Sequence, residues 1–107
     1  MATTTIGLVG AGTMGSGIAQ AGALSGYDVI MQDISDEQVA KGINSITKSL
    51  GRLAARDNIS STDQSSALAR IEGTTALDDL AECDLVIEAA TENIDLKIAV
   101  FGQLDAL

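Results

Sequence analysis

Apolar runs alternate with helically spaced apolar positions along this chain, which predicts strands and helices in turn. Residues 6–9, 27–32 and 84–89 are short apolar runs of the kind that form buried strands. Over residues 36–56, apolar side chains recur every three or four positions, which predicts an amphipathic helix. A shorter helix is expected from residue 61, so that only four residues separate it from the first and the two fold back as a hairpin.

Capping signals and glycines place the remaining elements. The runs Ser35-Asp36-Glu37-Gln38 and Ser61-Thr62-Asp63-Gln64 read as capping boxes, the second opening a helix that carries Ala67, Leu68 and Ile71. A short strand is expected near residues 70–75, and a helical turn or loop over residues 77–82. A last helix, capped by Asn93 or Asp95, is predicted to run through Leu96, Val100 and Leu104.

The order of these elements predicts an α/β fold, the amino-terminal part of a Rossmann-type doubly wound parallel sheet with a helical hairpin inserted after the second strand. Right-handed crossovers give the strand order 3-2-1-4. The fourth strand would then have an open edge with unpaired backbone groups, which favours self-association or a continuation of the chain. Residues 1–107 are expected to form one partial domain.

A glycine turn follows the first strand directly, as Gly10-Ala11-Gly12-Thr13-Met14-Gly15, and opens a segment of small, helix-compatible residues. Gly10 permits a sharp turn, Gly12 permits close approach to phosphates, and Gly15 permits close packing of the helix. Free amides at the helix start then hold the phosphates without a cation. The same glycines could serve only as a tight turn, but the strand, turn and helix together predict a dinucleotide site.

Asp33 ends the second strand, about 20 residues beyond the glycines, where an acid accepts hydrogen bonds from the adenine ribose. Its charge would also repel a 2′-phosphate, and neither Ile34 nor Ser35 offsets that repulsion. The cofactor NAD is therefore favoured over NADP. Asp33 could instead only cap the next helix, but Ser35 begins a capping box of its own.

Composition narrows the possible partners. Fifteen acidic and six basic residues give a formal charge of −9, which argues against nucleic acid and anionic membranes. The sequence shows no signal peptide and no apolar run long enough to span a bilayer, so a cytoplasmic protein is expected. Cys83 is the only cysteine and has no histidine partner, so we expect it to be an inert residue.

Four of the six basic residues form one stripe on the predicted helix over residues 36–56: Lys41, Lys48, Arg52 and Arg56. Their spacing places them on one helix face, with Ser49 one position round from it. Such a stripe could bind an anionic ligand. It could equally be a solvated face whose last cations complement the helix dipole.

The chain closely resembles the NAD-binding domain of the 3-hydroxyacyl-CoA dehydrogenase family. The resemblance covers essentially all of it. It rests on Ile6 to Ser35 with the glycine run, on Ala69-Arg70-Ile71 and Thr74-Thr75, and above all on Asp84-Leu85-Val86-Ile87-Glu88-Ala89-Ala90-Thr91-Glu92-Asn93. It implies an oxidoreductase that transfers hydride between NAD and the C3 hydroxyl of an acyl-CoA, 3-hydroxybutyryl-CoA being the expected substrate. It also implies a homo-oligomer that acts in fatty acid or butanoate metabolism.

The resemblance also implies site residues. Gly10, Ala11, Gly12, Thr13, Met14 and Gly15 look like the pyrophosphate loop, Asp33 like the ribose acid, and Glu92 and Lys97 like contacts near the nicotinamide. Ser49 and Arg56 match positions that contact coenzyme A, and Arg52 joins them in the stripe. The family more often has Lys-Lys-Gly-Lys where this chain has Ala55-Arg56-Asp57-Asn58, which puts tight binding of coenzyme A in doubt.

The chain contains no histidine, whereas family members use a histidine oriented by a glutamate for proton transfer. The expected serine, histidine and glutamate, and a helical dimerisation domain, would all follow Leu107. No catalytic residue and no metal site is therefore predicted within these 107 residues, and they are expected to be inactive alone. Two alternatives remain open: a free-standing NAD-binding regulatory module, and the cofactor half of an enzyme like 6-phosphogluconate or UDP-glucose dehydrogenase.

Overall fold

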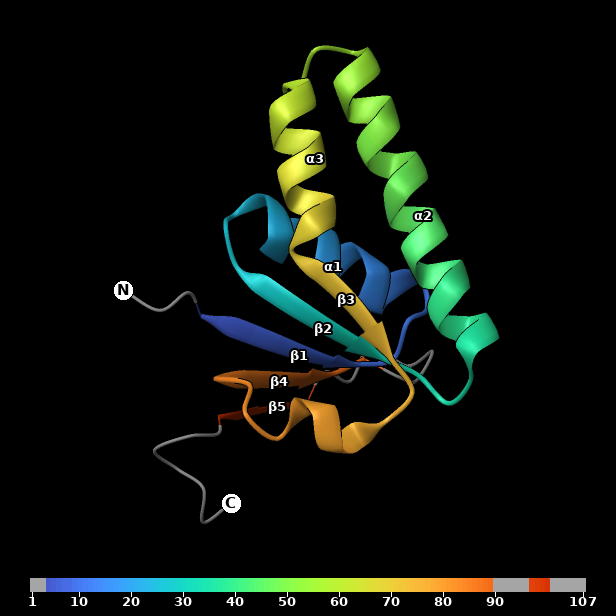
Figure 1. Ribbon diagram of the computed structural model, residues 1–107, viewed down its shortest axis with the longest axis vertical. Coiled ribbons are helices and arrows are strands. Elements are labelled where there is room, and N and C mark those ends of the chain that lie inside the picture. Colours follow the sequence, from blue (N-terminus) through green and yellow to red (C-terminus); the bar gives the residue numbers. More distant parts are fainter. Residues whose placement is uncertain (1–3, 90–96, 101–107) are drawn as a thin grey trace.

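The computed structural model describes residues 4–89 and, for the backbone alone, residues 97–100. Its strands form one sheet in the order β3-β2-β1-β4-β5 (Figure 1). The first four strands are parallel, and β5 is antiparallel to β4. Their bounds are Thr5–Val9 for β1, Asp28–Gln32 for β2, Ile71–Thr74 for β3, Leu85–Glu88 for β4 and Lys97–Val100 for β5. The predicted strand order 3-2-1-4 is confirmed.

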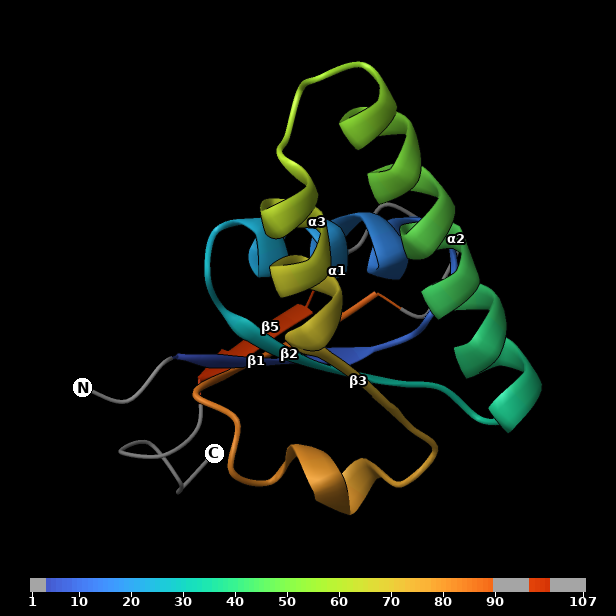
Figure 2. The ribbon, with the colours of Figure 1, turned by 45° about the horizontal axis from the view of Figure 1, so that its top comes forward.

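The helices gather on one face of the sheet. They are α1 (Thr13–Leu24), α2 (Asp36–Ala55) and α3 (Ser61–Ala69), whereas the short 3-10 helix η1 (Leu77–Leu80) lies on the opposite face (Figures 1 and 2). The helices α2 and α3 form the predicted hairpin, whose tip projects well beyond the sheet (Figure 1). The end of β1, the start of α1 and the start of α2 therefore meet at the carboxyl edge of the sheet.

Serine side chains begin both helices of the hairpin. The Ser35 hydroxyl accepts a hydrogen bond from the Gln38 amide at 3.2 Å, as the first capping box predicts. The second cap lies one residue earlier than predicted, because the Ser60 hydroxyl, not that of Ser61, accepts from the Asp63 amide at 3.0 Å. The end of this helix is also earlier, since Ile71 belongs to β3.

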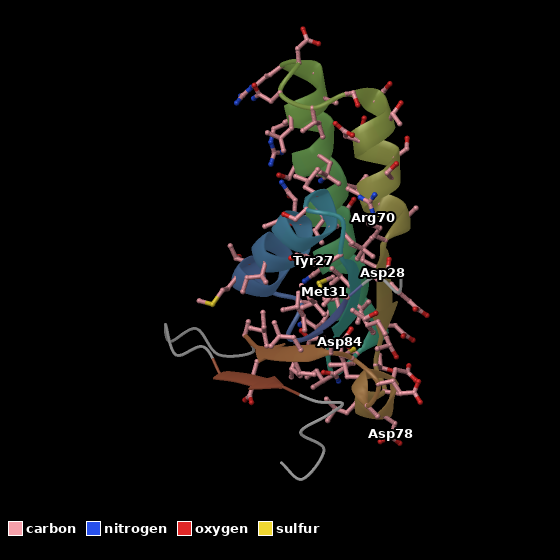
Figure 3. The ribbon with its side chains drawn as sticks, turned by 90° about the vertical axis from the view of Figure 1, so that its left-hand side faces the viewer. Tyr27, Asp28, Met31, Arg70, Asp78 and Asp84 are labelled. Atoms are coloured by element: carbon pink, nitrogen blue, oxygen red, sulfur yellow. The ribbon has the colours of Figure 1, made fainter. Side chains whose placement is uncertain are left out.

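The core is aliphatic, as the near absence of aromatic residues predicts, and lies between the sheet and the three helices. Figure 3 shows Met31 on the helical side of the sheet and Asp78 on the opposite side. Leu50, in the second half of α2, is fully buried and anchors the hairpin to this core. The cluster comprises Leu8, Ala11, Ala19, Ala23, Val29, Met31, Ile46, Leu50 and Ala67.

The predicted last helix is wrong for the part of it that the structure describes. Residues 97–100 pair with β4 as a strand, from Glu88 opposite Lys97 to Leu85 opposite Val100. The free edge of β4 offers unpaired backbone groups, and β-branched residues such as Ile98 and Val100 favour a strand. Because β5 covers the edge of β4, that edge is not open to a second copy of the chain, as the predicted self-association required. The proposed caps Asn93 and Asp95, with Leu96 and Leu104, lie outside the described residues.

None of the described helices has both the length and the apolar character that a bilayer-spanning helix needs.

We expect Leu50→Ala to lower the free energy of unfolding by about 3 kcal/mol, because it leaves a cavity where α2 packs on the core. Urea titration followed by circular dichroism measures the change. Leu77→Ala is the control, since 60% of the Leu77 side chain is exposed. Equal losses for the two variants would contradict the assignment of Leu50 to the core.

Candidate functional site

The glycine turn has a separate structural reason at each glycine. Gly10 has a φ of 116°, a left-handed conformation that favours glycine, and its amide donates to the Gln32 carbonyl at 2.7 Å. A Cβ on Gly15 would collide with the Gly10 carbonyl oxygen. A Cβ on Gly12, by contrast, would meet no atom of the described residues within 4 Å. The fold therefore requires glycine at positions 10 and 15, whereas no described residue occupies the space beside Gly12.

The amino end of α1 lacks the capping groups that the other two α-helices have. Its N-cap residue Gly12 makes no side-chain hydrogen bond, and its first turn contains no acid. The helices α2 and α3 have serine caps, and their first turns contain Asp36, Glu37 and Asp63. The first amides of α1 and its positive dipole end therefore stay available to an anion, since no side-chain acceptor of the first turn satisfies them.

Asp33 links the glycine turn to the end of β2. One carboxylate oxygen accepts a hydrogen bond from the Ala11 amide at 2.8 Å, and the other accepts from the Ile34 amide at 2.7 Å. A carboxylate has about four acceptor sites, so two remain for further donors such as hydroxyl groups. Because Asp33 is only half-buried, a ligand beside the turn could reach those two. The contact with Ala11 is a role that the sequence analysis did not foresee.

The structure leaves the basic stripe exposed along α2. Lys41, Lys48, Arg52 and Arg56 are all solvent-exposed, and Ser49 beside them is half-buried. At 1.5 Å per residue, the stripe spans roughly 22 Å, from the first third of α2 to the tip of the hairpin. Arg52 and Arg56 therefore lie at the end of α2 farthest from the glycine turn (Figure 1). The stripe and the turn are thus two separate regions.

Arg70 has a structural role that its sequence context did not predict. Its guanidinium donates to the Ala23 carbonyl at 2.8 Å, near the carboxyl end of α1, where a cation is favourable. Figure 3 shows Arg70 where α3 joins β3. The sequence gives only an indirect indication of this role, because Arg70 is one of the two basic residues that do not belong to the stripe.

The two predicted nicotinamide contacts, Glu92 and Lys97, differ in how far the structure describes them. Glu92 lies outside the described residues. The backbone of Lys97 lies in β5, paired opposite Glu88, which is a strand position and not the predicted helix. The assignment of both to the nicotinamide half therefore stays a prediction.

Two other features of the described residues, the face that carries η1 and the buried Cys83, do not suit an anion. A cavity on the face that carries η1 is lined by acidic residues, including Asp78, Asp79 and Glu82, which would repel phosphate. Cys83 is 1% exposed, and burial, followed by the charge of Asp84, raises the pKa of its thiol. The thiolate is therefore scarce near neutral pH, as expected of an unreactive cysteine. Within the described residues, no three His, Cys, Asp or Glu side chains gather to hold a metal ion.

Comparison with known proteins agrees with this geometry. The model of the family described as "3-hydroxyacyl-CoA dehydrogenase, NAD binding domain" matches residues 5–107. A 3-hydroxybutyryl-CoA dehydrogenase from Bradyrhizobium diazoefficiens is 40% identical over 102 residues, which are 95% of this chain and 35% of that protein. A probable 3-hydroxybutyryl-CoA dehydrogenase from Deinococcus radiodurans is 45% identical over 98 residues, or 92% of this chain and 35% of that protein.

The solved structures show the same relationship. The crystal structure of (S)-3-hydroxybutyryl-CoA dehydrogenase from Ralstonia eutropha is 54% identical, with a TM-score of 0.81. The match covers 88% of this chain and 33% of that one. The chain therefore spans about a third of the length of the relatives it matches.

We expect Gly12→Val to abolish NAD binding and to leave the thermal unfolding temperature within a few degrees of the parent chain. Its Cβ would enter open space, where no described atom lies within 4 Å, and its methyl groups would obstruct a phosphate that approaches the turn. Calorimetric titration with NAD and a circular dichroism melt measure the two effects.

Gly15→Ala is the comparison variant for this experiment. Its Cβ collides with the Gly10 carbonyl, so a clear loss of stability is expected. NAD binding retained by a folded Gly12→Val would remove the turn from the site.

Proposed function

The chain belongs to the 3-hydroxyacyl-CoA dehydrogenase family as its NAD-binding domain, and from this premise we propose that its glycine turn and Asp33 hold the dinucleotide for an enzyme that transfers hydride between NAD and the C3 hydroxyl of 3-hydroxyacyl-CoA. The proposed substrate is 3-hydroxybutyryl-CoA, because the relatives named above act on that compound according to their names. We also propose that the enzyme is a homo-oligomer and that it acts in the cytoplasm, in fatty acid or butanoate metabolism.

The observation that carries the proposal is the open space at Gly12 in front of an uncapped α1. A diphosphate placed there would accept hydrogen bonds from backbone amides and would lie at the positive end of the helix dipole. Gly12 and Thr13 are both exposed, which leaves room for this approach. NAD, when bound, supplies the redox chemistry, and the residues of this chain bind and orient it.

Asp33 is proposed to select NAD over NADP. Its two remaining acceptor sites suit the two ribose hydroxyls of NAD, which are donors. A 2′-phosphate on NADP would instead set like charges against each other. The nearest cation along the chain, Lys41, is five residues beyond the start of α2 and is exposed.

The stripe on α2 is proposed to bind coenzyme A through Ser49, Arg52 and Arg56. Its separation from the glycine turn suits a substrate that binds beside the cofactor and not in its place. Coenzyme A carries three phosphate groups, and guanidinium groups form paired hydrogen bonds with phosphate. The acid and base of the reaction are not assigned to this chain, because it contains no histidine.

We expect Asp33→Ala to weaken NAD binding about tenfold and to reduce the preference for NAD over NADP. The lost hydrogen bond to Ala11 loosens the turn for both cofactors, so the ratio of the two dissociation constants isolates the ribose contribution. Titration with both cofactors gives this ratio.

The control for Asp33 is Asp36→Ala, which removes the same charge from the first turn of α2. It should leave the ratio of the two dissociation constants unchanged. An unchanged ratio in Asp33→Ala would argue against recognition of the ribose.

Replacing Arg52 and Arg56 together with glutamine should lower the affinity for coenzyme A about tenfold and leave that for NAD unchanged. The matched comparison replaces Lys41 and Lys48 with glutamine, which removes the same charge from the same helix face. A smaller loss is expected from the lysine pair. Equal losses for the two pairs would indicate a general electrostatic effect instead of a site at the hairpin tip.

A further inference from the structure

We propose that Ser16 is a positioning residue that turns the Gly12 amide toward the cofactor phosphates. The proposal rests on the proposed function of the glycine turn and adds a residue outside the glycine motif. Ser16 lies in the first turns of α1 and is only 7% exposed, so no ligand in solvent would reach its hydroxyl freely. Its effect on a cofactor would therefore pass through the backbone that it contacts.

The Ser16 hydroxyl contacts two carbonyl oxygens on different elements. It donates to the Ala11 carbonyl at 3.1 Å, and the Gly42 carbonyl of α2 lies 3.5 Å away. A serine hydroxyl has one proton, and the shorter distance shows that the Ala11 carbonyl receives most of that bond. Ser16 thereby gives a hydrogen-bond donor to the Ala11 carbonyl, which precedes α1 and accepts no hydrogen bond of the regular helix pattern.

The geometry of the peptide bond converts this contact into an orientation for Gly12. The Ala11 carbonyl and the Gly12 amide belong to the same planar peptide, and no cis peptide occurs in the described chain. In a trans peptide the C=O and N–H groups point in opposite directions. Because the carbonyl points inward to Ser16, the Gly12 amide points the opposite way, toward the outside of the turn, where Gly12 is exposed.

The remaining contacts of Ala11 hold in place the residue to which this peptide is attached. Its amide donates to Asp33, and its side chain is 4% exposed. A Cβ on Gly42 would lie 2.7 Å from the Ala11 carbonyl oxygen and 2.9 Å from the Ala11 Cβ, so α2 lies against the turn. Ser16, Asp33 and Gly42 thus contact Ala11 from three sides. The Ala11–Gly12 peptide is therefore ordered before a phosphate binds, and binding does not have to offset the entropy lost on ordering it.

The test compares Ser16→Ala with the parent 107-residue chain. Loss of the hydroxyl leaves a buried carbonyl without its donor, so the peptide is free to turn and the dissociation constant for NAD should rise about fivefold. Thr47→Ala is the matched control, because it also removes a hydroxyl that donates to a main-chain carbonyl, that of Ile43 at 2.9 Å, away from the turn. It should leave NAD affinity unchanged.

A second readout separates positioning from stability. In proton–nitrogen NMR correlation spectra without ligand, the Gly12 amide resonance should move in Ser16→Ala and stay in place in Thr47→Ala. If the parent chain binds no NAD, the proposed function fails, while this spectral comparison still tests the orientation of the peptide. An unmoved Gly12 resonance together with parental NAD affinity in Ser16→Ala would overturn the role of Ser16.

If Ser16→Ala does not fold, two glycine variants on α2 test whether the position of the Ala11 carbonyl controls NAD binding. Gly42→Ala presses on the Ala11 carbonyl and should weaken NAD binding at least fivefold with the same shift of the Gly12 resonance. Gly51→Ala on the same helix has room, its Cβ being 3.9 Å from the nearest atom, the Gln64 side-chain nitrogen, and should bind NAD normally. Equal affinity in both glycine variants would contradict the proposal.

Discussion

The hydrogen bond from the Ala11 amide to the Asp33 carboxylate is the interaction on which the site depends. Ala11 and Asp33 are 22 residues apart in sequence, and the bond joins the turn after β1 to the turn after β2 at one edge of the sheet. Because α1 begins at the first turn and α2 follows the second, this contact also sets where the two helices start. The same carboxylate is thus both a structural acceptor and the proposed ribose acid.

Glycines let the helices approach this edge closely enough to hold the turn. Gly15 brings α1 against Gly10, Gly42 brings α2 against Ala11, and Gly73 lets β3 lie beneath Val39. An aliphatic, alanine-containing core suits such close packing, since small side chains let backbones approach. The outcome is a turn whose peptides are oriented before a ligand arrives.

An acidic protein can still bind an anionic dinucleotide, because repulsion by its net charge and attraction by the first amides of α1 act over different distances. The formal charge of −9 is spread over the surface and is screened within about 8 Å at physiological salt. The uncapped end of α1, which we propose holds the diphosphate, would act at contact distance through its amides and the helix dipole. The acids of η1 lie on the opposite face of the sheet, away from α1 (Figure 2).

The sequence by itself determined the strand order, the helical hairpin, the Ser35 cap and the position of the glycine turn, because apolar spacing, caps and glycines act over a few residues. Only the tertiary structure decided which groups hold Ala11, that Ser60 and not Ser61 caps α3, and that Arg70 meets the end of α1. It also decided that residues 97–100 form a strand, since the edge of β4 determines their pairing. Such contacts join residues far apart in sequence or compete with near-equal local choices, so no local pattern specifies them.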